Sequence, residues 1–265
     1  MLNNSPEIEQ LKREAEELLG AEDLKRYVND VCGLYAYVQE DRICTLFERA
    51  LLLSVSEGDG LNTWLSIIAR LWEFLLDMDH VSVFPYTLKL PDLMNAGSMQ
   101  KTSDRDIVLH TIEEDGVLES IFGRRILCVD ITAWIDRVEG ADFRAVLSRL
   151  KQSMEDQFVV FRIPAVDAVT LRRIREAIGW FMNVDALYCP PFTIDDYLIY
   201  AMRRLERSGI RVEAGVTEPL REIITNERRD RGFCGFKTVR RITDELTFAA
   251  LRNACAEKGR EDGHE

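Results

Sequence analysis

The sequence predicts an α/β fold with a five-stranded, mostly parallel sheet flanked by helices, followed by a C-terminal helical lid. Five short apolar segments alternate with stretches of helical periodicity between residues 50 and 189, and this alternation is typical of parallel sheets with helices on both faces. After Pro190-Pro191 the pattern changes to helices only. We therefore expect N-terminal helices over residues 1–46, an α/β core over 47–191 and a helical lid over 192–265.

Two helices are expected ahead of the sheet. Ser5 and Pro6 are suited to the N-cap and the first helical position, and Gly20 is suited to end the helix after Leu19. A second helix is expected from Ala21 to about residue 38.

The five expected strands are apolar runs bounded by turn residues. They are residues 50–55, 80–84, 125–131, 158–163 and 186–189, and prolines follow the second, fourth and fifth of them. Helices are expected over residues 61–76, after Asp142 as a cap, and over residues 169–181.

The lid shows clear helix boundaries. Thr193 and Asp196 have the spacing of a capping box, Gly209 is expected to end that helix, and Thr217 to begin the next. A last helix is expected to follow the turn at residues 232–235 and to reach about Cys255.

The acidic charge balance of the chain indicates which classes of partner it would repel. With 34 basic and 46 acidic residues, the formal net charge is −12, which repels phosphate backbones and anionic membranes. We expect no nucleic-acid partner and no membrane partner. The N-terminus lacks the order of a signal peptide, and no apolar run is long enough to span a bilayer, so a soluble protein of the cytoplasm is expected.

The cysteines and histidines predict no metal site. Six scattered cysteines without a C-x-x-C pair fit a reducing compartment, and the three histidines form no cluster with metal-ligand spacing. His110, near Asp104 and Glu113, is a conceivable acid–base residue. A lone histidine in an apolar helix is more often structural.

One segment has the position of a phosphate-binding loop. Residues 55–71, VSEGDGLNTWLSIIARL, follow an apolar strand and open a helix. The segment resembles the loop of AAA+ ATPases of the Rubisco-activase and stage V sporulation type, a P-loop NTPase family with the pattern G-x-x-G-x-G-K-T. Other segments resemble that family in the same order: residues 19–25 its entry helix, residues 127–130 its Walker B strand, and residues 232–241 its sensor-2 motif. The resemblance covers nearly the whole chain and implies an AAA+ core with a lid.

The departures from the family pattern fall on the residues that carry its chemistry. Leu61 replaces the lysine that binds the β- and γ-phosphates, and Asn62 replaces the threonine that binds Mg²⁺. Gly58 and Gly60 remain, and Thr63 offers a hydroxyl one position late. Glu57 and Asp59 add negative charge where a polyanion would bind.

The resemblance also implies losses elsewhere. Asp130 remains at the Walker B position, but Ile131 replaces the glutamate that orients water. Asp130 is at least as well explained as the cap of the turn into Ala133. Ile163-Pro164 replaces a polar sensor-1 residue, and residues 178–183 contain no arginine finger.

The sensor-2 position is occupied by Lys237, which keeps the charge of arginine without its bidentate geometry. A solvated helix face is the favoured interpretation of this lysine. It belongs to a basic cluster, in which solvation is again the simpler explanation and docking on an acidic partner the alternative. The cluster consists of Arg228, Arg229, Arg231, Lys237, Arg240 and Arg241.

Together these features predict a catalytically inactive AAA+-like protein that is not an enzyme. It is expected to act as a structural or regulatory subunit of a protein assembly, with an active AAA+ ATPase or another copy of itself as partner. No cofactor is expected. The alternatives are an ATP-binding protein that retains weak ATPase activity and weak Mg²⁺-ATP binding through the remnant residues, and a stand-alone scaffold.

Overall fold

The computed structural model describes residues 6–35, 49–75, 85–89, 125–153, 157–210 and 212–261. By their contacts these residues divide into two compact units. The α/β unit comprises residues 1–55 and 62–190, and the helical unit comprises residues 56–61 and 191–265. In the described residues, no helix combines the length and the apolar composition that spanning a membrane requires.

The α/β unit contains a five-stranded parallel sheet in the order β2-β3-β4-β1-β5. Its strands are β1 (Arg49–Ser54), β2 (Pro85–Lys89), β3 (Arg125–Asp130), β4 (Gln157–Ile163) and β5 (Asn183–Tyr188). The predicted fold class is therefore confirmed. Four strands lie where the sequence predicts them. The predicted strand at 80–84 lies outside the described residues, and β2 instead begins at Pro85, because a proline is tolerated at the first residue of a strand.

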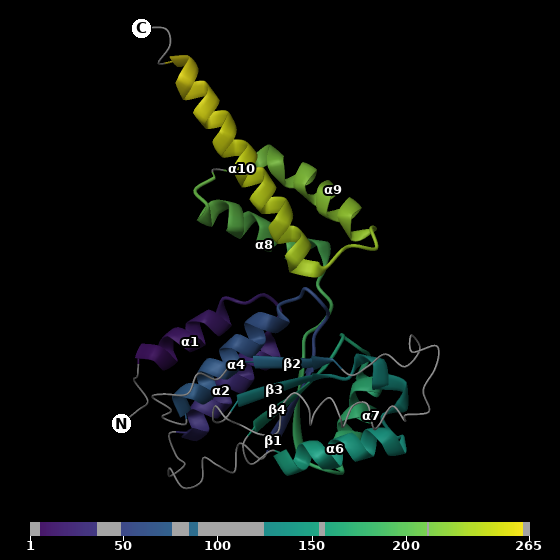
Figure 1. Ribbon diagram of the computed structural model, residues 1–265. Coiled ribbons are helices and arrows are strands. Elements are labelled where there is room, and N and C mark those ends of the chain that lie inside the picture. The colour runs from purple at the N-terminus through teal and green to yellow at the C-terminus, as the bar shows by residue number, and fades with distance from the viewer. Residues whose placement is uncertain are drawn as a thin grey trace. The chain divides into compact units, whose positions relative to one another are not determined.

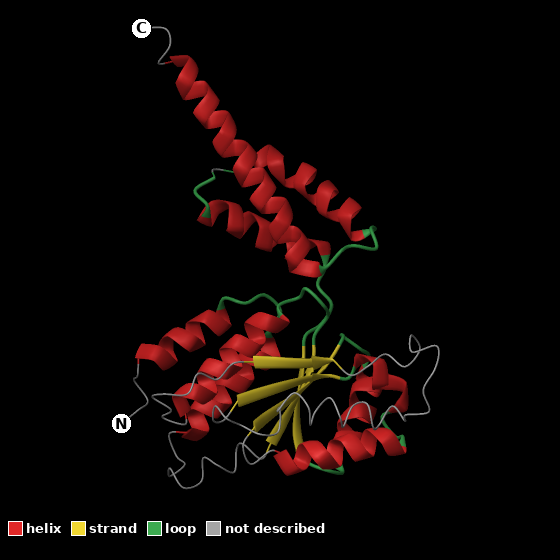
Figure 2. Cartoon of the chain, viewed as in Figure 1, coloured by secondary structure: helices red, strands yellow, loops and turns green. Residues whose placement is uncertain are grey.

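Helices cover both faces of this sheet (Figures 1 and 2). They are α1 (Pro6–Glu16), α2 (Glu22–Tyr35), α4 (Leu61–Leu75), α6 (Ala141–Ser153) and α7 (Ala168–Gly179), with the 3-10 helix η1 (Thr132–Arg137) after β3. One face packs on η1, α6 and α7 through residues such as Leu52, Val129 and Phe161. On α4, the Trp72 ring packs 4.8 Å from that of Phe158. Asp142 lies within the first turn of α6 rather than at its N-cap, which corrects the predicted cap.

The helical unit contains α8 (Ile194–Arg207), the short 3-10 helix η2 (Ala214–Val216), α9 (Thr217–Arg228) and α10 (Gly235–Glu261). The predicted capping box is present: Thr193 accepts from the N–H of Asp196, whose side chain accepts from the N–H of Thr193. Gly209 follows α8 with φ of 76°. In Figure 1, the second half of α10 extends beyond α8 and α9, and its residues from Leu251 to Ala256 are exposed.

Candidate functional site

The loop at residues 56–61 has the backbone shape that its glycines predict. Gly58 and Gly60 adopt φ of 82° and 97°, in the left-handed region that glycine enters at little cost. Within the turn, the N–H of Asp59 donates to the carbonyl of Ser56 at 3.2 Å. The chain thus passes from β1 through a tight turn into α4, as expected for a strand–loop–helix motif.

The loop belongs to the helical unit, whereas the sequence places it in the core. A Cβ atom on Gly58 would lie 2.1 Å from the carbonyl oxygen of Cys234, and one on Gly235 would lie 2.0 Å from Oδ1 of Asp59. These are direct contacts of the loop with the backbone at the start of α10. Residues 176 positions apart form them, so local sequence pattern gives no sign of the grouping.

Asp59 is the centre of these contacts. Its side chain is buried, and Oδ1 accepts a hydrogen bond of 2.9 Å from the hydroxyl of Tyr197 on α8. The backbone N–H of Phe236 in α10 also donates to the carboxylate, and Arg228 of α9 acts on it electrostatically. Burial raises the pKa of Asp59 more than these three interactions lower it. The carboxylate is held by the protein itself.

Aromatic rings surround Tyr197 in the helical unit. Its ring lies 5.0 Å from that of Phe236, 5.3 Å from that of Phe233 and 6.0 Å from that of Phe192. The guanidinium carbon of Arg228 lies 5.9 Å from the centre of the Tyr197 ring, within the range of cation–π attraction. The Tyr197 hydroxyl is therefore positioned by packing on several sides.

Three other predicted site residues face solvent. Asn62 and Thr63 lie in the first turn of α4, and both are exposed. Lys237 is exposed on α10, beside a shallow surface hollow that Arg240, Arg241 and Phe248 also line. This placement agrees with the simpler interpretation of Lys237 as part of a solvated helix face.

Asp130, at the end of β3, has both carboxylate oxygens engaged within the α/β unit. The N–H and the hydroxyl of Thr132 donate to Oδ1 at 3.0 and 2.6 Å. Arg162 on β4 donates from Nη1 to Oδ2 at 2.9 Å and to the Thr132 hydroxyl at 3.1 Å. Arg162 is the register partner of Asp130 in the adjacent strand. Only 12% of the Asp130 side chain and 10% of the Arg162 side chain are exposed.

These groups do not fit a magnesium ion. Mg²⁺ requires carboxylate and other oxygen ligands in near-octahedral geometry, and here a guanidinium cation already occupies one oxygen of Asp130. A Mg²⁺ ion at the same carboxylate would be repelled by the positive charge of Arg162. Asp130 does cap the turn into η1, as the sequence suggests. Motif patterns give Arg162 no role, although a charged residue within an apolar strand is the signal that identifies it.

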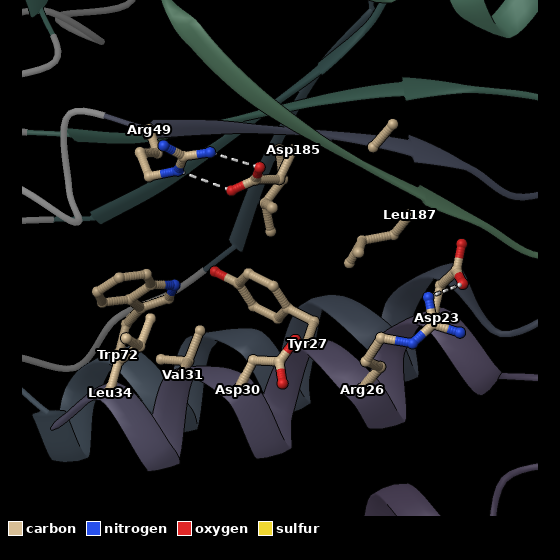
Figure 3. Close-up of a pocket in the computed structure, with 12 residues that line it drawn as sticks. Asp23, Arg26, Tyr27, Asp30, Val31, Leu34, Arg49, Trp72, Asp185 and Leu187 are labelled. Carbon is tan, nitrogen blue, oxygen red and sulfur yellow. Dashed lines mark hydrogen bonds and ion pairs between the residues drawn. The ribbon is translucent and has the colours of Figure 1, made fainter. Parts of the chain in front are cut away.

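A separate hollow of about 390 Å³ lies in the α/β unit between α2 and strands β1 and β5 (Figure 3). Arg49 donates from Nε and Nη2 to the two carboxylate oxygens of Asp185 at 2.8 and 2.6 Å. Tyr27 points toward this pair. Burial raises the pKa of Tyr27, with Trp72 opposing through a hydrogen bond, so the phenol stays protonated. A closed ion pair and a protonated phenol provide no acid–base group, and we assign this hollow no chemistry.

His110, with Asp104 and Glu113, lies outside the described residues. In the part of the chain that the structure describes, no group of three or more histidine, cysteine, aspartate or glutamate side chains has an arrangement suited to a metal ion.

Comparisons with known proteins give similarity to solved structures. No protein-family model and no curated protein matches the sequence. A DNA replication initiation factor is 10% identical, with 93% of this chain and 68% of that chain covered and a TM-score of 0.45. Replication initiator DnaA bound to AMPPCP and single-stranded DNA is 8% identical (89% and 65% covered, TM-score 0.44). C. elegans PCH-2 is 12% identical (94% and 73% covered, TM-score 0.43). The chain covers just under two thirds of DnaA, and these likenesses concern the fold alone.

The fold itself is a parallel sheet flanked by helices, together with a helical unit. One expectation is contradicted: nucleic acid was excluded as a partner, yet the DnaA structure similar to this chain contains single-stranded DNA. The exclusion rested on the net charge of the whole chain. Residues 191–265 contain fourteen basic and fourteen acidic residues, so the net charge of −12 does not describe this part of the molecule.

Proposed function

We propose that this chain is a catalytically inactive AAA+-like protein that acts as a structural or regulatory subunit of a protein assembly. One observation carries the proposal: the carboxylate of Asp130 is neutralised by Arg162 and engaged on both oxygens. An ATPase of this type uses that carboxylate to hold Mg²⁺ on the phosphates. In this chain a cationic side chain contacts the carboxylate at the place where the metal ion would bind.

The residues around Asp130 support the same proposal. Ile131 is fully buried, and its N–H donates to the carbonyl of Arg162 at 3.0 Å, so the position of the water-orienting glutamate is part of the core. Pro164 offers only its carbonyl, which accepts from the hydroxyl of Ser54 at 3.1 Å. Leu61 leaves the loop without the ammonium group that would bind phosphate. No single substitution therefore restores the chemistry.

Phosphate release from Mg²⁺-ATP tests the absence of catalysis. Purified wild-type protein and Asp130→Asn are expected to release phosphate at the same rate as buffer, because neither has a metal-binding carboxylate. Asp130→Asn distinguishes turnover by this chain from turnover by a contaminating ATPase, because a contaminant would remain active in the preparation of the variant. Activity in the wild type that Asp130→Asn abolishes would refute the proposal.

The subunit role requires a partner, and we propose an active AAA+ ATPase or another copy of this chain, in a reducing compartment such as the cytoplasm. Five cysteines of the described residues are free thiols, in keeping with such a compartment. The test is co-purification followed by reconstitution with the purified partner, measured by light scattering after size exclusion. A stable complex of defined stoichiometry is expected. A chain that stays monomeric with every AAA+ ATPase of its source cell would exclude the role.

The second candidate is an ATP-binding protein with weak residual activity. The positive φ angles of Gly58 and Gly60 favour it, because they keep the turn of a phosphate-binding loop. Saturable, Mg²⁺-dependent binding of ATP in the absence of other proteins would distinguish it from the inactive subunit.

A further inference from the structure

Asp59 places a buried carboxylate in a loop where it would repel phosphate, and nucleotide chemistry gives no reason for its presence there. Asp59 is 7% exposed, whereas Glu57 in the same loop is exposed. A buried carboxylate is costly unless hydrogen bonds compensate it. Here Tyr197 and the N–H of Phe236 provide those bonds.

The N–H of Phe236 belongs to the first turn of α10, whose N–H groups have no partner within the helix. A different N–H group at this end of the helix, that of Cys234, donates to the Thr238 hydroxyl at 2.8 Å. Asp59 therefore supplies to α10 what a capping side chain normally supplies from the adjacent sequence. The glycines at 58 and 235 allow the two backbones to approach closely enough.

We propose that Asp59 is a side-chain latch that fixes the loop at residues 56–61 to α8 and α10. The loop then serves to organise the helical unit, with its own carboxylate in place of a bound ligand. The inference does not depend on the absence of catalysis, which rests on Asp130 and Arg162 in the other unit.

The environment of the carboxylate also predicts how the stability of the fold depends on pH. The groups that face the carboxylate are the Tyr197 hydroxyl of α8, Arg228 of α9, and the Phe236 N–H in the first turn of α10. Burial outweighs them and raises the pKa of Asp59 above its value in the unfolded chain. The folded protein therefore binds the proton more tightly, so protonation of Asp59 favours folding. This contribution grows as the pH falls through the folded-state pKa and is complete below the unfolded-state pKa.

Hydrogen exchange measured by mass spectrometry tests the latch. In Asp59→Ala, peptides covering residues 56–61 and the first turn of α10 are expected to exchange about tenfold faster than in the wild type, because a capping bond and its partner bond are lost together. The matched control Glu57→Ala is expected to exchange as the wild type. Unchanged exchange of both peptides in Asp59→Ala would overturn the latch.

Two isosteric variants keep the proposal testable if Asp59→Ala does not fold. Tyr197→Phe removes only the donating hydroxyl and is expected to accelerate exchange of residues 56–61 several-fold, an effect that shrinks when Asp59→Asn is also present. In thermal melts from pH 7 to pH 4, the melting temperature of the wild type is expected to rise relative to that of Asp59→Asn. Additive effects of the two substitutions would overturn the latch, and parallel pH profiles would contradict the expected pH dependence of stability. Neither result bears on the phosphate-release measurement.

Discussion

Arg162 is the residue on which the functional interpretation depends most. It lies in the interior strand β4, between the fully buried residues Phe161 and Ile163. A charge in such a place is unfavourable unless it is paired. Asp130 provides that pairing from the adjacent strand. Under the proposed function, the carboxylate that an ATPase would use for Mg²⁺ is paired with Arg162 within the sheet.

Replacing Arg162 is expected to destabilise the α/β unit. Arg162→Met leaves the carboxylate of Asp130 buried without its cation, which costs about 3 kcal/mol of unfolding free energy. Urea denaturation measures this change. Arg144→Met, at an exposed position of α6, serves as the control and is expected to stay within about 0.5 kcal/mol of the wild type.

The double variant Asp130→Asn with Arg162→Met makes the test specific. It removes both charges and is expected to be more stable than Arg162→Met alone, because the uncompensated carboxylate is gone. A double variant whose loss equals the sum of the two single losses would show that the two side chains do not interact.

At the scale of elements, the loop at residues 56–61 and the start of α10 form one structural feature. Gly58→Ala forces a side chain into a backbone conformation that disfavours it and against the carbonyl of Cys234. We expect a loss of about 1–3 kcal/mol of unfolding free energy. The measurement is chemical denaturation followed by circular dichroism.

Gly33→Ala is the matched control for this prediction. Gly33 lies in α2 and has no positive φ. A Cβ atom added there would have no other atom within 4 Å. The alanine is expected to stabilise the protein by up to about 1 kcal/mol, since alanine favours helix interiors. Equal effects of the two substitutions would contradict the close packing inferred at Gly58.

The sequence predicted the elements that local chemistry determines. The Thr193 capping box, the left-handed Gly209 just after α8 and the start of α9 at Thr217 all lie where expected, because caps and turns depend on neighbouring residues. Asp142 was predicted as a cap, but α6 begins at Ala141, so Asp142 lies in its first turn. An acidic residue favours the first turn of a helix as well as its cap.

The interactions that define the candidate site were not predictable in the same way. Asp130 and Arg162 are 32 residues apart, and Asp59 and Tyr197 are 138 residues apart. Both pairs depend on strand order and helix packing, which no local pattern specifies. The sequence draws attention to Asp59 and Asp130, but their partners Tyr197 and Arg162 follow only from the structure.

At the scale of the whole molecule, charge is distributed unevenly along the chain. Residues 1–190 contain 20 basic and 32 acidic residues, whereas residues 191–265 are balanced. Net charge governs long-range attraction, while binding depends on the local surface. This uneven distribution is why the acidic composition was a poor guide to partners, and why the proposed function rests on individual contacts.

The central claim is that the chain has lost the chemistry of Mg²⁺-ATP, and calorimetric titration with Mg²⁺-ATP tests it most directly. With the buffer titration as reference, we expect no heat of binding up to millimolar nucleotide, because Leu61 offers no cation and Asp130 is engaged by Arg162. Saturable heat that requires Mg²⁺ and disappears in Asp130→Asn would contradict the account.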